Sequence, residues 1–448
     1  MQGKELLLGV LNHKEYGMVP WVPFAGVHAG RLKGFSADEI LQDEFKLLDS
    51  LKEVNSQYQP DGQPVLFDLQ VEAEILGCEL KWAKKAPPSV VSHPLSENPD
   101  VPSRLPEKSD GRLPMILNVM QEFKKYAGTS TALFGLVCGP FTLASHLRGT
   151  DIFMDMIDNP EYVQNLIAYT KDVTIRMAEF YIEAGMDVIA VVDPITSQIS
   201  PFHFKEFLSK RFTEIFDFIK EHKTASSFFV CGDATKNIEE MCRTRPDSIF
   251  IDENINIAEA KKITDRNTIV IGGNIPLTSV MLLGTQKDNM KFVIDMLDTL
   301  DHKNLVIAPG CDMPYDVPPE NVIGVVQAIR NPEEIKHVLQ HYKEEEITIE
   351  VDLPDYKNLR KPLIEVFTVD SATCPACGYM ANAAHEAKNH FGDKVDYVER
   401  KIIIMENLKR VSKLGIKNLP CILINGELKY SSIIPGKKDL LATIESYL

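Results

Sequence analysis

The chain has 448 residues, of which 44% are hydrophobic and 25% charged, a composition that is ordinary for a globular protein in water. One hydrophobic core rarely serves a chain of this length, so we expect two domains. The formal net charge of −16 at pH 7 argues against nucleic acid or an anionic membrane surface as a partner. No apolar run reaches the roughly eighteen residues of a membrane helix, and the first residues lack a leader pattern, so we expect a cytoplasmic protein.

Short apolar runs recur along the first 310 residues, and each of them ends on Gly, Asp or Cys. In chain order they are WVPFAG (21–26), PVLFD (64–68), ALFGLVCG (132–139), DVIAVVD (187–193), SSFFVCG (226–232), SIFID (248–252), TIVIGG (268–273) and NLVIAPG (304–310). Runs rich in Val, Ile and Phe without polar alternation are typical of a parallel sheet that is covered on both faces. Because helical patterns separate them, they predict a (β/α)₈ TIM barrel over residues 1–340. A doubly wound open sheet is the alternative, but no GxGxxG motif opens a helix after the first run.

In such a barrel the chemistry lies at the carboxyl ends of the strands. In order, those ends carry His28 and Arg31, Asp68, the Gly139-Pro140 loop with His146, Asp193, Cys231, Asp252, Asn274 and Cys311. We therefore expect two thiols, several carboxylates and imidazoles at one mouth, with Cys231 facing the active site. The plainer interpretation, that Cys231 and Cys311 are small buried residues, stays open because free cysteine is among the most buried residue types.

The barrel pattern ends after Arg330, and residues 341–362 read as a charged linker. Residues 363–448 form a further unit, which begins with the predicted strand LIEVFTVD (363–370). Cys374-Pro375-Ala376-Cys377 then opens a helical stretch, and Leu419-Pro420 precedes a later strand. This order resembles the thioredoxin/glutaredoxin fold, so we expect a C-terminal thioredoxin-like α/β domain.

The CxxC motif predicts a redox pair. On the first turn of a helix, the dipole and the free amides stabilise the thiolate of Cys374, and Cys377 lies one turn along, where it can resolve a mixed disulfide. Both are assigned as catalytic. Cys421 follows Pro420, which matches the cis-proline loop of thioredoxin-like folds, and three roles for it stay open: metal ligand, extra redox partner or apolar filler.

The barrel resembles the uroporphyrinogen decarboxylase superfamily over residues 1 to about 330. The stretches that carry the resemblance are His28-Ala29-Gly30-Arg31, FDLQVEAEILGC (67–78), Gly139-Pro140-Phe141-Thr142-Leu143, GGN (272–274) and PGCDMPYDVPPENV (309–322). In the decarboxylases, a pair of arginines in the first motif binds substrate carboxylates, and here Val27 replaces one of them. A family tyrosine falls on His146 and a family histidine on Cys311, whereas Asp68 is kept. These departures disfavour decarboxylation of a porphyrinogen.

The same motifs suggest which residues contact substrate. His28 and Arg31 are expected to orient an anionic tail of the substrate, with a solvated loop as the alternative. Asp68 is expected to be catalytic, with a helix cap or a hydrogen-bonded core residue as the alternative. Asp193 is expected to bind substrate at the mouth, although its place before Pro194 also suits a turn.

The cysteines resemble those of the zinc-dependent methylcobamide:thiol methyltransferases, which hold zinc with a His-x-Cys pair and a later cysteine in a Gly-Cys motif. Cys231 and Cys311 match the cysteines, but the histidine position is Phe229. The resemblance implies zinc at Cys231 and Cys311, with His146 as the first candidate for a further ligand. The other candidates are Asp193, Glu72 and Glu74. Zinc takes soft sulfur ligands and deprotonates a thiol that enters its open position, which would prepare that thiol to attack a methyl group.

The resemblance thus implies a methyltransferase that moves a methyl group between a cobamide and a small thiol or methylated donor. No Asp-x-His-x-x-Gly segment occurs in the sequence, so the cobamide is expected on a separate corrinoid carrier protein. The redox unit would keep the zinc thiolates reduced. Two alternatives stay open: a thiol-disulfide oxidoreductase whose barrel selects the substrate, and a metal-independent decarboxylase that uses Asp68 and Arg31. A homodimer also stays open.

Overall fold

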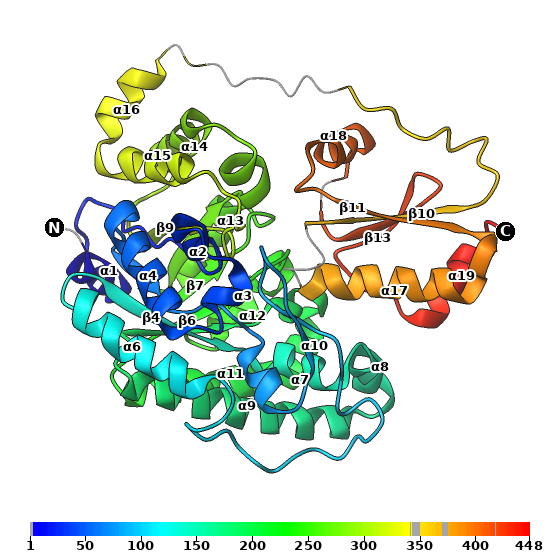
Figure 1. The fold of residues 1–448 in the computed structure, drawn as a ribbon, viewed down its shortest axis with the longest axis horizontal. Helices are drawn as coiled ribbons and strands as arrows, with labels where there is room; N and C mark the ends of the chain where they lie inside the picture. The colour runs from blue at the N-terminus through cyan, green and yellow to red at the C-terminus, as the bar shows by residue number, and fades with distance from the viewer. Residues whose placement is uncertain (1–2, 341, 343–349, 370–374, 417) are drawn as a thin grey trace. The chain divides into compact units, whose positions relative to one another are not determined.

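The computed structural model describes residues 3–340, 342, 350–369, 375–416 and 418–448 (Figure 1). The chain divides into two compact units, of which the first ends at Tyr342 and the second at Leu448. Each unit has its own sheet. Within the described residues, no helix is both long and apolar enough to cross a membrane.

The first unit is built on seven parallel strands, in the order β1-β4-β5-β6-β7-β8-β9. Their bounds are β1 (Gly62–Pro64), β4 (Ala132–Cys138), β5 (Val188–Val192), β6 (Ala225–Val230), β7 (Ser248–Ile251), β8 (Val270–Ile275) and β9 (Leu305–Pro309). Every residue of these strands is buried except Ala225, as expected for a sheet that is covered on both faces. The strands from β4 to β9 overlap the six corresponding predicted runs.

Helices surround this sheet (Figure 1). The longer ones are α4 (Glu44–Tyr58), α6 (Leu113–Ala127), α9 (Pro160–Glu183), α11 (Ser209–Glu221), α13 (Ile257–Arg266), α14 (Gln286–Thr299) and α15 (Pro319–Arg330). The shorter ones are α1 (Lys4–Leu11), α2 (His28–Lys33), α3 (Ala37–Ile40), α5 (Val71–Ile75), α7 (Pro140–Arg148), α8 (Asp151–Asp158), α10 (Pro201–His203), α12 (Ile238–Arg243) and α16 (Pro332–Leu339). A small hairpin pairs β2 (Leu80–Lys81) with β3 (Ser89–Val90). The unit is therefore an α/β structure of the (β/α)₈-barrel type.

The first predicted strand, residues 21–26, is present only as a single bridge. Trp21 pairs with Ile307 of β9, where Val22 N donates to Ile307 O over 3.0 Å. On its other side, Trp21 O accepts from Asp61 N at 2.9 Å, next to β1. The segment around Trp21 thus joins the two end strands of the sheet and closes the ring. Pro20 and Pro23 flank it, and because proline donates no hydrogen bond a longer strand cannot form here.

Five phenylalanines fill the interior of the ring: Phe24, Phe67, Phe134, Phe229 and Phe250. The ring centroids of Phe24 and Phe229 lie 4.6 Å apart, and Phe24 meets Phe250 edge to face at 5.1 Å. Such tilted and perpendicular pairs are the arrangements that aromatic rings prefer. The barrel interior is therefore a packed aromatic core rather than a pore.

The second unit carries a four-stranded sheet of order β11-β10-β12-β13. Its elements are β10 (Leu363–Thr368), α17 (Pro375–Phe391), β11 (Asp396–Lys401), α18 (Met405–Leu414), β12 (Cys421–Ile424), β13 (Glu427–Ser431) and α19 (Lys437–Glu445). The strand β10 pairs parallel with β11 and antiparallel with β12. Part of the predicted linker belongs to this unit, because Tyr356 donates a 2.6 Å hydrogen bond to buried Glu365 and Val351 O accepts from Lys413 at 2.6 Å.

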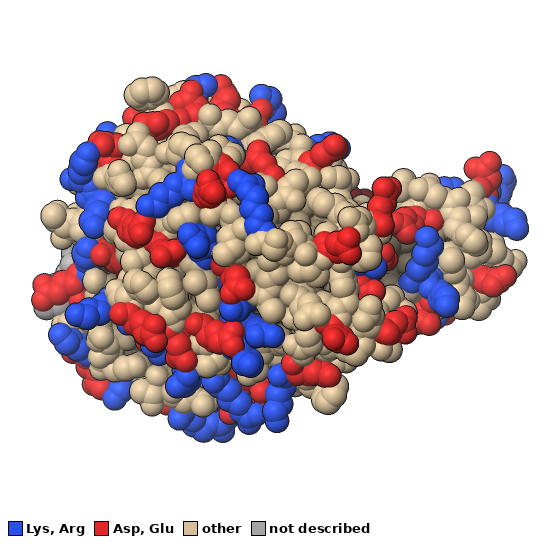
Figure 2. Space-filling model, turned by 90° about the horizontal axis from the view of Figure 1, so that it is seen from below, with Lys and Arg blue, Asp and Glu red and all other residues tan. Residues whose placement is uncertain are grey.

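Acidic and basic side chains are interspersed over the larger unit on the face that Figure 2 shows. On this face, the chain's excess of acidic residues is therefore not concentrated in one acidic patch.

The closure of the ring generates a stability prediction. Buried Asp61 accepts from Trp21 N at 2.8 Å and pairs with Arg330 of α15, also at 2.8 Å. Asp61→Asn leaves the nearly buried guanidinium without its counter-charge, so the free energy of unfolding of the barrel should fall by about 3 kcal/mol. Both tryptophans of the chain, Trp21 and Trp82, lie in this unit, so tryptophan fluorescence in a denaturant titration reports on it alone.

The matched control is Asp295→Asn, which removes an exposed pair with Lys291 on α14. It should change the free energy of unfolding by no more than about 0.5 kcal/mol. Equal unfolding midpoints for the two variants would contradict the role assigned to Asp61.

Candidate functional site

The two cysteines expected at the barrel mouth lie side by side. Cys231 follows β6 and Cys311 follows β9, and the two form a disulfide with a Cα–Cα distance of 5.8 Å across 80 residues of sequence. Both residues are partly exposed, whereas the other described cysteines of this unit, Cys78, Cys138 and Cys242, are buried. The strand ends thus bring the two sulfurs together, as expected, but in a bond to each other.

The residues at the end of β7 contact the backbone next to both cysteines. The Asp252 carboxylate accepts hydrogen bonds from the backbone N–H groups of Gly232, the neighbour of Cys231, and Asn254. At Gly310, the neighbour of Cys311, an added Cβ would lie 2.7 Å from Glu253 N. Only glycine permits that approach, so the backbones beside the two cysteines rest on the same strand end.

Three carboxyl groups near the two cysteines have raised pKa values. Burial, with a further contribution from the charge of Asp252, raises the pKa of Glu253 to about 8, and Leu277 N donates to this carboxylate. Burial also raises the pKa of Asp252 and, more strongly, that of Asp312, which accepts from Gly26 N at 2.7 Å. On this side of the mouth, burial therefore disfavours the charged form of three carboxyl groups.

The described residues do not complete a metal site around the cysteines. Among them, no three or more His, Cys, Asp or Glu side chains are grouped so that they could hold a metal ion. His146 is buried on α7 with its Nδ1 unpartnered, and burial and the nearby His93 lower its pKa to about 3. The structure thus does not bring His146 to Cys231 and Cys311. Catalytic zinc sites use three protein ligands, so the arrangement does not fit such a site.

Phe229 explains part of the incomplete ligand set. It stands two residues before Cys231, so its side chain leaves β6 on the same face, toward the barrel axis. Its ring is fully buried and lies within 5.8 Å of the rings of Phe67 and Phe250, measured between centroids. The position where relatives are expected to carry a histidine ligand is therefore part of the aromatic core.

Asp68 takes part in a buried ion pair that the sequence did not suggest. Its Oδ2 lies 2.8 Å from Nη1 of Arg112, and Nε of the same arginine lies 2.7 Å from Glu74. The guanidinium also lies 5.0 Å from the centre of the Trp82 ring. Arg112 ends the polar stretch before α6, where nothing in the local pattern marks it as a partner of Asp68. Asp68 is held by this arginine, with Gln70 N as a second donor at 2.9 Å.

The Asp193 carboxylate also has hydrogen-bond donors from the protein itself. Its carboxylate accepts from Phe141 N at 2.9 Å and from Thr142 N at 3.0 Å, and so it caps the start of α7. Burial raises its pKa to about 7. Next to it, Glu72 accepts from Cys138 N at 2.9 Å, and burial raises the pKa of Glu72 to about 7. These two carboxyls organise the ends of β4 and β5 through the backbone amides that they accept from.

His28 and Arg31 connect α2 to the loop that follows Cys311. Buried His28 lies between the Tyr58 hydroxyl, at 2.7 Å from Nε2, and Tyr315 O, at 3.1 Å from Nδ1. Burial lowers the pKa of His28 to about 4, so the ring is neutral at pH 7. Arg31 pairs with Asp316 at 2.8 Å. Both side chains thus hold the Cys311 loop in place.

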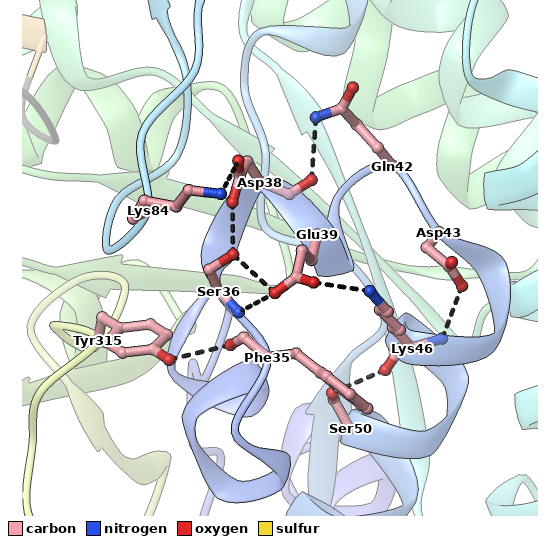
Figure 3. A network of polar contacts seen from close by, with 10 residues as sticks. All are labelled: Phe35, Ser36, Asp38, Glu39, Gln42, Asp43, Lys46, Ser50, Lys84 and Tyr315. Atoms are coloured by element: carbon pink, nitrogen blue, oxygen red, sulfur yellow. Dashed lines mark hydrogen bonds and ion pairs between the residues drawn. The ribbon is translucent and has the colours of Figure 1, made fainter.

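The network in Figure 3 extends this connection. The Tyr315 hydroxyl donates to Phe35 O at 2.9 Å, immediately before Ser36, which forms a capping box with Glu39 at the start of α3. Glu39 in turn pairs with Lys46 of α4 at 2.7 Å. The loop after Cys311 is therefore anchored to three successive helices of the N-terminal segment.

In the second unit, Cys374 lies outside the described residues. Cys377 is buried on the first turn of α17. The Leu419–Pro420 peptide bond is cis, and Cys421 begins β12, opposite Phe367 of β10. Burial raises the pKa of Cys421 to about 12, so it is a neutral thiol at pH 7. This agrees with the apolar-filler role.

The profile of the family described as "Uroporphyrinogen decarboxylase (URO-D)" matches residues 2–332. The chain belongs to this family. It is 28% identical over 272 residues to "Methylcobamide:CoM methyltransferase MtbA" of Methanosarcina acetivorans, covering 60% of this chain and 78% of that protein. It is 30% identical over 272 residues to "Methylcobamide:CoM methyltransferase MtaA" of Methanosarcina barkeri, covering 58% and 77%. A "Uroporphyrinogen decarboxylase" of Nostoc sp. is 22% identical over 273 residues.

A solved structure described as "methyltransferase from Methanosarcina mazei" superposes with a TM-score of 0.66. It covers 73% of this chain and 98% of its own length at 23% identity. This likeness supports the barrel fold of the first unit. The matches to the curated relatives cover about 58–60% of the chain.

The raised pKa of Glu72 generates a prediction about pH. Because the folded state keeps a proton that the unfolded chain releases above pH 4.5, the stabilising effect of this proton is lost as the pH rises from 4.5 to 7. Glu72→Gln keeps the shape and the acceptor oxygen without the charge. It should match the wild type near pH 5 and exceed its free energy of unfolding by about 3 kcal/mol at pH 8.

Denaturant titrations at pH 5 and pH 8, followed by tryptophan fluorescence, measure the difference. The control is Glu79→Gln, since Glu79 is exposed and lies a few residues along the chain. A Glu72→Gln effect that is the same at both pH values would rule out a buried ionisation at this position.

Proposed function

We propose that the barrel unit is a corrinoid-dependent methyltransferase, which moves a methyl group between a cobamide on a separate carrier protein and a small thiol or methylated donor. The observation that carries this proposal is the similarity to two methylcobamide:CoM methyltransferases at 28–30% identity over 77–78% of their length. The replacement of decarboxylase residues by Val27, His146 and Cys311 supports it as well.

The chemistry requires a proton acceptor. When a thiol takes the methyl group, its sulfur forms a bond to the methyl carbon, the cobalt–carbon bond breaks with its electron pair left on cobalt, and the S–H proton leaves. A group with a pKa near the working pH removes such a proton best. Glu253, with a pKa of about 8 at the end of β7, has that property and lies beside the backbone of the Cys311 loop. We assign it as the base.

The zinc ion that the cysteines imply has no complete ligand set among the described residues, as shown above, and its two sulfurs are bonded to each other. No step of the proposed reaction passes through zinc.

The assay for this function mixes the full-length chain with methylcobalamin and coenzyme M, and follows the cobalamin absorbance. Thiol-dependent loss of the methylcobalamin spectrum is expected. Glu253→Gln should slow it by about 100-fold at neutral pH, the usual size of a general-base effect. Glu259→Gln, an exposed glutamate on α13 that pairs with Lys262, is the matched control and should keep the wild-type rate. No reaction with any of a panel of small thiols and methylated thiols would contradict the proposal.

The second candidate function is thiol-disulfide exchange by residues 363–448, as a thioredoxin-like domain. Two observations favour it. The elements follow the order β-α-β-α-β-β-α, with Cys377 of the CxxC motif on the first turn of α17, and a cis-proline immediately precedes Cys421 at the start of β12. The decarboxylase alternative gains no such support, because Asp68 is paired with Arg112 and Arg31 with Asp316.

This candidate predicts that Cys374→Ser removes disulfide reductase activity toward a small disulfide substrate, such as oxidised glutathione, in the presence of a thioredoxin-type electron supply. Cys421→Ser should retain most of it, since that thiol is buried and neutral at pH 7. Equal activity in wild type and Cys374→Ser would remove the second candidate without affecting the first.

A further inference from the structure

We propose that Cys231 and Cys311 are a thiol-disulfide exchange site in the barrel unit, a reversible disulfide whose co-reactant is a dithiol. The site stands in place of a ligand pair for zinc. This inference concerns the first unit alone and does not rest on methyl transfer.

The backbone holds the two cysteines together independently of their bond. Gly232 donates to the carboxylate of Asp252, and Gly310 packs against Glu253 N, so the residue beside each cysteine is fixed to the end of β7. The loop after Cys311 is also tied to α2 through Tyr315 and Asp316. The Cα–Cα distance of 5.8 Å lies within the usual range for disulfides. After reduction the two thiols therefore remain neighbours, and the bond can form again.

The solvent exposure of the cysteines points to the same pair. Cys231 and Cys311 are partly exposed, so a small thiol can reach them. Burial raises the pKa of Cys78 and of Cys242 to about 12, and raises that of Cys138 strongly. Those thiols are both covered and protonated at neutral pH, and thiol exchange needs an accessible thiolate. Within the described part of the barrel unit, exchange is therefore confined to the Cys231–Cys311 pair.

The surroundings favour the uncharged disulfide over two thiolates. Two residues before Cys231, the buried ring of Phe229 supplies neither a metal ligand nor a hydrogen-bond donor. Among the described residues no third metal ligand joins the two sulfurs, which are bonded to each other.

The exchange proceeds in two steps. A thiolate of the dithiol attacks one cysteine sulfur, the bond between Cys231 and Cys311 breaks, and the released sulfur takes up a proton. The second thiol of the reductant then attacks the mixed disulfide and releases the other cysteine, which is protonated in turn. Two electrons and two protons pass from the dithiol to the cysteine pair, and the dithiol becomes a disulfide.

The test maps the thiols of the full, folded chain by alkylation with iodoacetamide and peptide mass spectrometry. After treatment with oxidised glutathione, a linked Cys231–Cys311 peptide should be present. Dithiothreitol under native conditions should remove it completely. Iodoacetamide should then add one alkyl group to each of the two cysteines, while Cys78, Cys138 and Cys242 stay unmodified. Removal of dithiothreitol and addition of oxidised glutathione should restore the linked peptide.

Three results would overturn the proposal: a linked peptide that never forms, one that yields to dithiothreitol only after denaturation, or a stoichiometric zinc ion that protects both cysteines from alkylation. Cys231→Ser should lose the linked peptide and leave Cys311 open to alkylation, whereas Cys242→Ser, the matched control, should retain the link. If Cys231→Ser does not fold, the wild-type mapping decides alone. Because the readout is mass, a failure of methyl transfer leaves it unaffected.

Discussion

The ring closure around Trp21 is the constraint on which the first unit depends. A parallel sheet presents all its carboxyl ends at one edge, but only a closed ring turns that edge into a mouth in which distant strands face one another. Here a single bridged residue joins β9 to the start of β1, and the buried Asp61–Arg330 pair fixes that junction. The five phenylalanines fill the interior of the ring. The meeting of β6 and β9 at their ends follows from this closure.

The mouth combines two sulfurs with several carboxyl groups whose pKa values are raised. On one side, Glu253 and Asp312 have raised pKa values because burial disfavours their charge. On the other side, Glu72 and Asp193 do so for the same reason while holding backbone amides. All four acids accept hydrogen bonds from backbone amides, and so they fix the strand ends and loops around the mouth.

Sequence patterns predicted the barrel class and the strands from β4 to β9, because uninterrupted apolar runs with short polar ends leave few alternatives. They also predicted that Cys231 and Cys311 meet, since residues at parallel strand ends share one edge. The partner of Asp68 could not be found this way, because Arg112 belongs to a loop and its pairing is a tertiary contact. The roles of His28, Arg31 and Asp193 as structural anchors likewise depend on partners far along the chain. The sequence showed that Phe229 replaces an expected histidine ligand, but its place in the aromatic core became clear only from the packing.

The bridge between Trp21 and Ile307 also has a consequence for how the protein is made. The segment that completes the ring leaves the ribosome before every strand of the sheet, and its partner strand β9 is the last of the seven. Contacts of such long sequence separation form late and slowly. The nascent barrel must therefore wait as an open sheet with two unpaired edges until β9 emerges, and during that interval those edges are where chaperones would have to act.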